Sequence, residues 1–524
     1  MHRLPPAVAV VDAAGAAARD ASAIAAGIPS RALMQRAGAA AASVIATHYA
    51  GDLMAGVVIA TGVGNNGGDG WVIAAALLAA GVPVRVVECA PARTADAIAE
   101  RAHAVAAGAV VQGDARELLR GPERIVVDAL LGTGYRADGR LPEWLGMATG
   151  LLGEARGHGV AVVAVDVPTL LDASDGRHEG AARADLTITF GTMKRGHLVA
   201  RALCGRVVVV DIGLGAHATQ AGEARLATPA WFRAHVPAID ASAHKGTRGK
   251  VAIIGGAVGM AGAAILAARG ALRSGAGMVR CVIAPESVAA VQAAEPAALT
   301  APWPADDDAM RRAVADWADV VLIGPGLGRD GARAMVERLL ANFEGPVVLD
   351  ADALFAFSGE SGALKALLGG RAALLTPHPV EFGRLAGLGV EEVLAKRFEL
   401  PRELAARTGA AVLLKGVPTI VAGVRGDVTC VAEGTPILAT GGAGDILGGV
   451  AAALLASVEE PALAGALAAF AHGRAAHAVS ARQVRGYTLD DVLHELPATW
   501  AVAPDAPRPP ILAELPAVGE EASE

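Results

Sequence analysis

Two glycine-rich stretches hold the side chains whose types and spacing could do chemistry. The first reads GVGNNGGDG at residues 62–70, and the second reads TGGAGD at residues 440–445. Each leads into a stretch with the pattern of a helix, so its backbone N–H groups would face an anion at the helix N-terminus. Both stretches therefore predict binding sites for small molecules that carry phosphate.

The first stretch fits more than one kind of site. Its glycines at residues 62–67 match the G-x-G-x-x-G spacing, and Glu88 ends the next apparent strand, as in NAD-dependent dehydrogenases. That hypothesis does not need the polar side chains of Asn65, Asn66 and Asp69. A plain tight turn is the structural alternative, because Asn-Gly is a common turn dipeptide. We favour a ligand site, since the loop follows a strand at the end where parallel sheets bind ligands.

Three further polar residues stand at the ends of apparent strands in the same half of the chain. Asp128 lies in the run IVVDA, Asp166 ends VAVVAVD, and Lys194 follows LTITF. The carboxyl ends of parallel strands meet at one edge of a sheet, so these side chains are expected to converge on one crevice. A lone aspartate there is often only a helix cap, but two carboxylates and a lysine beside a glycine loop predict a reactive site.

The second stretch predicts a site for phosphoryl transfer. Gly441, Gly442 and Gly444 would turn consecutive N–H groups toward an anion, and Asp445 stands beside them. An aspartate there can accept the proton of a hydroxyl group while a phosphoryl group arrives, and phosphoryl transfer depends mainly on positioning and charge stabilisation. The structural alternative is a glycine-rich helix start that Asp445 merely caps.

Two runs of alternating strand and helix patterns must position these residues. The first run has strand-like apolar segments at residues 57–61, 84–88, 125–129, 160–166, 186–190 and 207–211. The second run starts at KVAIIGG and ends near residue 497. Continuous apolar strands with helices between them predict parallel sheets covered on both faces. We therefore predict two α/β domains, 1–220 and 221–500, and a disordered, Pro-rich, acidic tail over 501–524.

The composition restricts the kind of partner. The chain has 524 residues and a net charge of −8 without long runs of like charge, which argues against nucleic acid. No uninterrupted apolar stretch reaches the roughly 18–20 residues of a membrane span, and the N-terminus lacks a signal-peptide pattern. The four cysteines are far apart, which argues against a zinc site. We expect a cytoplasmic homo-oligomer that binds small molecules and neither nucleic acid nor a membrane.

The first domain resembles a known family. The segments AGIPSRALMQRAG, GVGNNGGDG, DALLGTG, VDVP and DLTITFGTMK are similar to the NAD(P)H-hydrate epimerase family, the YjeF N-terminal domain, over residues 10–215. The resemblance implies a Rossmann-like three-layer αβα fold. It also implies conversion of the R form of hydrated NADH or NADPH into the S form, with a bound potassium ion.

This resemblance implies roles for individual residues. Asp166 and Lys194 would be catalytic residues of the epimerase. Potassium would be bound by Asn66, Asp128 and Thr169, since oxygen ligands suit a hard cation. The residues implied to contact the hydrated nucleotide are Asn65, Asn66, Gly67, Gly68, Asp69, Gly132, Thr133, Gly134, Tyr135, Arg136, Ala137, Asp138 and Asp166.

One position departs from the family pattern. The family usually has DVPSGLD after this strand, whereas the present chain has Leu170 in place of the glycine. A backbone φ above zero would be costly for leucine at this position. The departure leaves open the alternative that the first domain is a binding module without catalysis.

The second domain resembles ribokinase-like kinases in its G-x-G-D arrangement and, within that fold, the NAD(P)H-hydrate dehydratase family. Six segments carry this resemblance in order from His244 to about Pro497: HKGTRGKVAIIGG, GMAGAAILAARGALRSGAGMV, IGPGLGRD, LDADAL, LTPHPVEFGRL and LLKGVPT. It implies a ribokinase-like αβα domain that uses ADP with magnesium. In that family the β-phosphoryl group goes to the 6-hydroxyl of the S-form hydrate. Loss of phosphate then restores the nicotinamide ring, with AMP as the other product.

This second resemblance also assigns roles by position. Asp445 would be the catalytic base, and Gly441, Gly442 and Gly444 would form the anion hole. The hydrate pocket would be lined by Ala263, Gly326, His378 and Asp445, and the adenine nucleotide would contact Lys415, Gly416, Val417, Pro418, Thr419 and Gly444. For His378 the structural alternative is a histidine that is only hydrogen-bonded in a turn. Phe355 stands where the family usually has asparagine.

Together the two resemblances imply a bifunctional repair enzyme that epimerises hydrated NAD(P)H and dehydrates the S form. The alternative is a ribokinase-like small-molecule kinase with a non-catalytic nucleotide-binding N-terminal domain. The segments GMAGAA and TPHP argue against that alternative.

Overall fold

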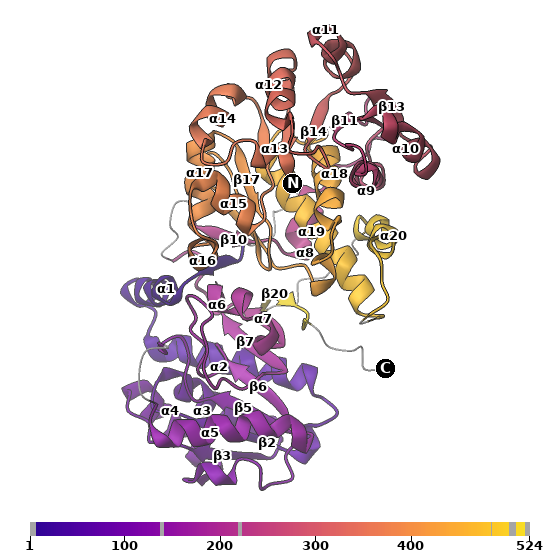
Figure 1. Ribbon diagram of the computed structural model, residues 1–524. Helices are drawn as coiled ribbons and strands as arrows, with labels where there is room; N and C mark the ends of the chain where they lie inside the picture. Colours follow the sequence, from indigo (N-terminus) through magenta and orange to yellow (C-terminus); the bar gives the residue numbers. More distant parts are fainter. Residues whose placement is uncertain (1–6, 137–140, 218–222, 484, 502–509, 519–524) are drawn as a thin grey trace. The chain divides into compact units, whose positions relative to one another are not determined.

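The computed structural model describes residues 7–136, 141–217, 223–483, 485–501 and 510–518, and it divides the chain into two compact units (Figure 1). The N-terminal unit comprises Pro6–Glu223 together with Ala506–Gly519, and the C-terminal unit comprises Ala224–Asp505. Both units are α/β structures built on a largely parallel sheet, as the alternating apolar patterns predict. No helix among the described residues is long and apolar enough to cross a membrane.

The sheet of the N-terminal unit has the strand order β20-β9-β7-β6-β5-β2-β3-β4. Every neighbouring pair is parallel except β20 with β9. The strand bounds are β2 Val57–Thr61, β3 Val84–Glu88, β4 Val110–Gln112, β5 Ile125–Ala129, β6 Ala161–Val165, β7 Leu186–Phe190 and β9 Arg206–Val210. Strand β1 (Ala9–Val11) pairs in parallel with β8 (Met193–Lys194).

Helices cover both faces of this sheet. Alternate residues of a strand point to opposite faces, and those of β2 divide accordingly: Val57 and Ile59 join one buried cluster, Val58 and Ala60 the other. Helices α2 (Ser30–His48) and α3 (Asn65–Ala79) belong to the first cluster, and α5 (Glu143–Ala155) to the second. The other helices of this unit are α1 Ala13–Ala25, α4 Ala95–Ala106, α6 Arg195–Val199 and α7 Arg201–Cys204.

The C-terminal segment differs from the prediction. Strand β20 (Ile511–Leu515) pairs antiparallel with the edge strand β9, so the expectation of a disordered tail over 501–524 is wrong for these residues. Ala513 and Leu515 of this strand are buried, and the Glu514 carboxylate lies 2.6 Å from the guanidinium of Arg206. An edge strand offers unpaired N–H and C=O groups, and β20 satisfies those of β9. Residues 502–509 and 519–524 lie outside the described part of the chain.

The C-terminal unit contains the strand order β13-β12-β11-β14-β15-β16-β17-β18-β19-β10. Strands β13 to β17 are parallel, β18 is antiparallel to both of its neighbours, and β10 is parallel to β19. The bounds are β10 Ala224–Leu226, β11 Lys250–Ile254, β12 Met278–Ile283, β13 Leu299–Pro302, β14 Val320–Ile323, β15 Val347–Leu349, β16 Ala373–Leu375, β17 Ala411–Leu414, β18 Thr419–Ala422 and β19 Val428–Val431.

Helices also lie on both sides of this sheet (Figure 1). One side holds α9 Ala261–Arg273, α10 Val288–Ala294, α18 Ala443–Leu455, α19 Pro461–Ser480 and α20 Leu489–Thr499. The opposite side holds α12 Ala332–Asn342, α14 Ser361–Leu368 and α17 Leu400–Thr408. The remaining helices are α8 Pro229–His235, α11 Asp307–Met310, α13 Asp352–Phe355, α15 Pro379–Ala386 and α16 Val390–Ala395.

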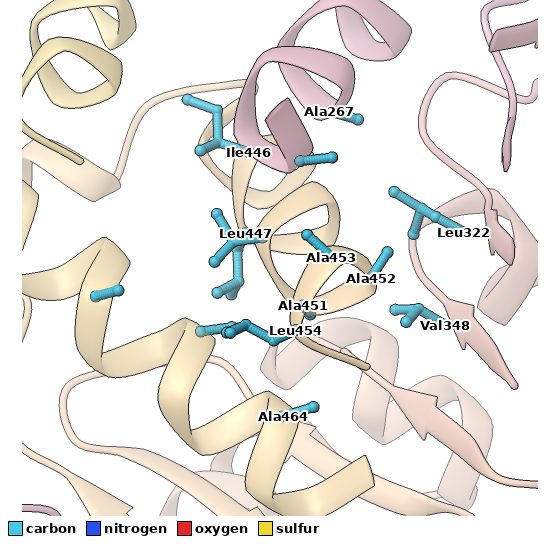
Figure 2. Close-up of a cluster of buried hydrophobic side chains, with 14 of the residues drawn as sticks. Ala267, Leu322, Val348, Ile446, Leu447, Ala451, Ala452, Ala453, Leu454 and Ala464 are labelled. Atoms are coloured by element: carbon cyan, nitrogen blue, oxygen red, sulfur yellow. The ribbon is translucent and has the colours of Figure 1, made fainter. Parts of the chain in front are cut away.

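Helix α18 is the central buried helix of the C-terminal unit. Figure 2 shows its side chains Ile446, Leu447 and Leu454 among buried apolar neighbours that include Ala267 of α9 and Ala464 of α19. A Cβ at Gly449 would lie only 2.0 Å from the carbonyl oxygen of Ala267, so only glycine permits this close approach of α9 and α18. The tight packing fixes the N-terminal turn of α18, which carries Asp445.

Candidate functional site

The N-terminal unit contains a cavity of about 440 Å³ at the carboxyl ends of β2, β5, β6 and β7. Of the residues predicted to contact the hydrated nucleotide, those that line it are Asn65, Asn66, Asp69, Gly132, Thr133, Gly134 and Asp166. Lys194 lines it as well. Gly67 packs against the backbone of Gly62 and not on the cavity. Ala137 and Asp138 lie outside the described residues. The topology therefore brings most of the predicted set to one place.

The polar stretch after β2 forms the start of a helix. Helix α3 begins at Asn65 with Gly64 as its N-cap, and no side chain among the described residues caps its first N–H groups. Uncapped N–H groups at the positive end of a helix dipole attract anions. The loop therefore offers both amide side chains and backbone donors to the cavity.

Asp166 and Lys194 form a buried ion pair. The Lys194 Nζ lies 2.6 Å from Asp166 Oδ1, and its side chain is 3% exposed. The same ammonium also donates to Thr189 Oγ1 at 2.7 Å and to the carbonyl oxygen of Phe190 at 3.2 Å. Burial alone would raise the pKa of Asp166, but Lys194 lowers it below the usual range. The Lys194 ammonium therefore stabilises the deprotonated form of Asp166.

His197 contacts the backbone of both members of this ion pair. This role of His197 was not predicted from the sequence. Its Nε2 lies 2.8 Å from the carbonyl oxygen of Asp166, and its Nδ1 accepts from the backbone N–H of Lys194 at 3.3 Å. Burial and the Lys194 charge lower the pKa of His197 to about 3. A neutral ring with its proton on Nε2 satisfies both contacts. The Asp166 backbone has φ +66, a left-handed conformation that this hydrogen bond helps to hold.

Three residues predicted to bind potassium carry side-chain oxygen atoms, and one of them, Asn66, lines the cavity. Asp128 is buried and accepts from the Thr169 hydroxyl at 2.6 Å and from the Thr169 N–H at 2.9 Å. The Asn66 side chain is 8% exposed, and both its amide oxygen and its amide nitrogen lack a hydrogen-bond partner among the described residues. Burial raises the pKa of Asp128, although the two Thr169 donors oppose it. A buried amide without a partner is costly, so this site has the unmet polar groups that a bound ion would satisfy.

Two carboxyl groups complete the wall of the cavity. Asp20 of α1 was not predicted from the sequence, whereas Asp69 of α3 was. Burial raises the pKa of Asp69 well above its usual value, and the charges of Asp166 and Asp20 raise it further. Burial and Asp166 likewise raise the pKa of Asp20, against an opposing effect of Lys194. One lysine faces three neighbouring carboxyl groups, so like-charge repulsion adds to burial in raising the pKa of Asp20 and Asp69.

The second site lies at the carboxyl ends of the parallel strands of the C-terminal unit. Asp350 directly follows β15 and Lys415 directly follows β17. The Lys415 Nζ lies 2.7 Å from Asp350 Oδ1 and 3.9 Å from Glu381 Oε2. Burial would lower the pKa of Lys415, but these two carboxylates raise it. Lys415 was predicted as a nucleotide contact, whereas Asp350 and Glu381 were not singled out.

Asp445 lies in the first turn of α18, next to this ion pair. Gly442 adopts φ +97 as the N-cap of the helix, and a Cβ at Gly444 would lie 3.2 Å from Lys415 Nζ. Burial and the neighbouring Asp350 raise the pKa of Asp445 to about 7, against the opposing charge of Lys415. A carboxyl group with this pKa changes protonation near neutral pH, which is what a general base for a hydroxyl group requires.

The residues predicted to line the hydrate pocket occupy neighbouring loops. A Cβ at Gly326 would lie 3.0 Å from the Ala263 Cβ, so these two positions are in contact. His378 is the N-cap of α15, where its Nδ1 accepts from the N–H of Val380 at 3.2 Å. This hydrogen bond is the one expected if His378 has only a structural role in a turn. The His378 Nε2 lies 3.4 Å from Glu381 Oε1, and the His378 side chain is 47% exposed. A hydrate contact of His378 stays a prediction.

The segment KGVPT begins at Lys415 and connects β17 to β18. The Thr419 hydroxyl donates to the Gly416 carbonyl oxygen at 2.8 Å, which closes the turn, and Val417 is exposed. The turn thus presents backbone and one apolar side chain to solvent, and its contact with an adenine nucleotide stays a prediction.

Comparison with known proteins identifies the family. A model of the YjeF-related protein N-terminus matches residues 30–196, and a model of NAD(P)H-hydrate dehydratase matches residues 251–498. The bifunctional NAD(P)H-hydrate repair enzyme of Salinibacter ruber is 38% identical over 516 residues, which cover 91% of this chain and 93% of that one. The enzyme of the same name from Moorella thermoacetica is 35% identical over 513 residues, covering 90% and 92%. This chain belongs to the family of bifunctional NAD(P)H-hydrate repair enzymes.

A solved structure of an ADP/ATP-dependent NAD(P)H-hydrate dehydratase from Bacillus subtilis, co-crystallised with ATP and Mg²⁺, is also similar. It is 29% identical with a TM-score of 0.46, and the match covers 52% of this chain and 96% of that chain. Membership of the repair family confirms both predicted resemblances and the two-domain α/β fold class.

Leu170 shows how this member accommodates a departure from the family pattern. Its backbone has φ +70, the left-handed region, while its side chain is 1% exposed within the apolar cluster that includes Leu130 and Leu145. Left-handed backbone costs a non-glycine residue about 1–2 kcal/mol, and burial of a leucine side chain offsets that with about 1.5–3 kcal/mol. The neighbouring Thr169 still donates to Asp128. With leucine at this position, the loop thus combines a left-handed backbone with the Thr169–Asp128 hydrogen bond.

Phe355 is the second departure. It ends α13, and two arginines lie over its ring: the Arg329 Cζ is 4.2 Å and the Arg384 Cζ is 5.5 Å from the ring centroid. The aromatic ring thus replaces a polar side chain with a stacking surface for cations.

Proposed function

We propose that this chain is a bifunctional nicotinamide-nucleotide repair enzyme. The N-terminal unit interconverts the R and S hydrates of NADH and NADPH. The C-terminal unit dehydrates the S form at the expense of ADP and gives NAD(P)H, AMP and phosphate. The observation that carries this proposal is that relatives with that name match across both units, over 90% of the chain.

In the dehydratase reaction, Asp445 accepts the proton of the substrate 6-hydroxyl as its oxygen attacks the β-phosphorus of ADP. The bond between that phosphorus and the oxygen bridging to AMP breaks, and AMP leaves. Phosphate then departs from C6 with the electrons of the C–O bond as the ring nitrogen donates its lone pair. Loss of a proton from C5 forms the C5=C6 bond of the dihydronicotinamide. The pKa of about 7 at Asp445 suits the first proton transfer.

The backbone around Asp445 serves the moving phosphoryl group. Gly441, Gly442 and Gly444 would offer backbone N–H groups to an anion at the N-terminus of α18. No side chain among the described residues caps this end, and the helix dipole favours negative charge there. Among the described residues, no group of three or more His, Cys, Asp or Glu side chains could hold a metal. Magnesium would accompany the phosphates of ADP and neutralise part of their charge.

In the epimerase reaction, the C–O bond at C6 breaks and re-forms on the opposite face of the ring. Lys194 gives a proton to the departing oxygen as the ring nitrogen lone pair expels water, and the Asp166–Lys194 pair takes a proton from the water that adds back. Asn65, Asp69 and Thr133 in the cavity wall would hold the substrate by its polar groups. The ion pair at 2.6 Å supports this assignment.

Potassium fits the oxygen atoms of the three residues predicted to bind it. Asn66, Asp128 and Thr169 would hold it, since Asn66 has an unpartnered buried amide oxygen and Asp128 has no cation partner among the described residues. When bound, potassium would supply a fixed positive charge for oxygen atoms of the substrate.

Product identity separates this proposal from a ribokinase-like kinase. S-form NADH hydrate is incubated with ADP, magnesium and the protein, and the products are resolved by chromatography. The proposal predicts NADH, AMP and phosphate in equal amounts. A stable phosphorylated product with no reduced nicotinamide would contradict it and favour the kinase with a non-catalytic first domain.

A further inference from the structure

Arg329, Phe355 and Arg384 form a cluster, named here the arginine–phenylalanine cluster, at the edge of the C-terminal site. Arg329 comes from the loop after β14, Phe355 from the end of α13, and Arg384 from α15, the helix that His378 caps. The two guanidinium carbons lie 4.2 Å and 5.5 Å from the centroid of the same ring. One aromatic ring therefore gathers two cations from separate loops.

Among the described residues, no carboxylate forms an ion pair with Arg329 or Arg384, and no side-chain hydrogen bond engages either of them. Arg333 provides a contrast within the same unit: it lies 4.2 Å from the Phe357 centroid, but its guanidinium also pairs with Glu337 at 2.6 Å. Two like charges near one ring repel each other, and a bound anion would relieve that repulsion.

The two guanidinium groups of the arginine–phenylalanine cluster indicate which kind of ligand it would bind. Both arginines are exposed, so their planar donors are accessible from solvent. A guanidinium presents a fork of N–H groups that matches phosphate geometry, and two of them can hold one phosphate through several charge-assisted hydrogen bonds. The cluster therefore has the features of a phosphate-binding site.

The cluster lies on the segments that carry the predicted hydrate pocket. Arg329 follows Gly326 by three residues, and the Gly328 N–H between them donates to the Asp352 carboxylate at 2.9 Å, which begins the helix of Phe355. Arg384 follows His378 by six residues, which in a helix is about 9 Å along the axis. A dinucleotide whose nicotinamide ring lies at Gly326 and His378 would extend over this distance.

We propose that Arg329 and Arg384 bind a phosphate group of the dinucleotide hydrate, and that the Phe355 ring positions them. This inference rests on the proposed dehydratase function of the C-terminal unit. The phosphate is either the 2′-phosphate, which only NADPH hydrate has, or the pyrophosphate, which both hydrates share. The two sources predict different substrate selectivity and can be told apart.

The test is steady-state kinetics of the dehydratase with each S hydrate and with ADP. Arg329→Ala and Arg384→Ala are expected to raise KM for NADPH hydrate by about tenfold or more, because each removes charge-assisted hydrogen bonds, with little change in kcat. If the 2′-phosphate is the ligand, KM for NADH hydrate stays constant. If the pyrophosphate is the ligand, both values rise together. Arg384→Lys, which keeps the charge, is expected to recover part of the loss.

Arg333→Ala is the matched control, since it also removes an arginine from a phenylalanine ring, and its KM values are expected to match those of the wild type. Thermal unfolding of each variant checks that the fold is retained. Unchanged KM for both hydrates, or a rise confined to ADP, would overturn the inference while the wild-type dehydratase activity stands. Absence of that activity in the wild type would instead overturn the proposed function itself.

Discussion

Lys194 holds the Asp166 carboxylate at 2.6 Å, and His197 bonds to both residues through their backbones. Asp166 follows β6, Lys194 ends β8 and His197 lies in α6, yet hydrogen bonds and the ion pair join the three residues into one group. The geometry fixes a charged amine and a carboxylate at the wall of a cavity in which burial raises the pKa of the other two carboxyl groups, Asp69 and Asp20. This is the arrangement that acid–base chemistry at a ring carbon requires.

Removal of the amine tests this group. Lys194→Ala is expected to slow R-to-S epimerisation by roughly 10²–10⁴-fold, because it removes the proton donor. Dehydration of pure S hydrate is expected to stay at the wild-type rate, which serves as the internal control. Because the substitution leaves Asp166 buried without its cation, unfolding is followed in parallel. An unchanged epimerisation rate in the folded variant would favour a binding module in place of an epimerase.

Asp445→Asn tests the base of the second site. The substitution removes the proton acceptor but keeps the shape of the side chain, so ADP-dependent formation of NADH is expected to disappear, whereas epimerisation continues. NADH absorbance and the R-to-S ratio by chromatography measure the two reactions in one sample. Dehydration that survives this change would show that another group takes the proton.

The pH dependence of the dehydratase follows from the same carboxyl group. Because Asp445 must be deprotonated to act and its pKa is raised to about 7, kcat/KM is expected to fall as pH drops below 7 and to level off above it. The stability effect has the opposite sign. A folded-state pKa above the unfolded value costs stability as pH rises from about 4 to 7, so Asp445→Asn is expected to raise the melting temperature relative to wild type at pH 8 and not at pH 4. Equal melting temperatures at pH 8 would contradict the raised pKa.

The potassium site predicts a difference between two adjacent asparagines. Asn66 is buried with an unpartnered amide, whereas Asn65 is exposed at the cavity wall. Asn66→Ala is expected to weaken the activation of epimerisation by potassium, and Asn65→Ala to raise KM for the hydrate with the potassium response unchanged. Titration of each variant with potassium at constant ionic strength measures the response. The site assignment fails if both variants keep the wild-type potassium curve.

At Leu170 we expect an unusual order of stability between the glycine and the alanine variants. Both Leu170→Ala and Leu170→Gly remove a buried side chain, a loss of about 2–5 kcal/mol. At most sites glycine is the less stable of the two, but at φ +70 it relieves about 1 kcal/mol of backbone strain. Leu170→Gly is therefore expected to be more stable than Leu170→Ala in urea unfolding. The reverse order would show that the loop does not hold the left-handed conformation.

Much of the candidate site could be predicted because parallel sheets gather their carboxyl ends at one edge. Asp166 and Lys194 meet for that reason, and Lys415 directly follows β17, whereas Asp445 was predicted from the glycine-rich stretch that begins α18. Asp350 was not singled out, since its role depends on Lys415, which lies 65 residues later in the chain. The sequence alone does not predict an ion pair between residues so far apart in the chain.

The local sequence pattern also gave a wrong prediction for a segment whose structure depends on a neighbouring strand. The segment around Ile511–Leu515 is short and flanked by prolines and acidic residues, which predicts disorder. It forms a strand because β9 offers an open edge to pair with. His197 was missed because a single histidine after Lys194 carries no pattern, and only its two backbone contacts reveal its role.

The central claim is that one chain completes repair of both epimers. The direct measurement is the recovery of reduced-nicotinamide absorbance from an R and S mixture of NADH hydrate with ADP, magnesium and potassium. The account predicts recovery of the whole mixture, with the R fraction restored well above its spontaneous rate. Recovery that stops at the S fraction would contradict an active epimerase in the N-terminal unit, and no ADP-dependent recovery would contradict the account as a whole.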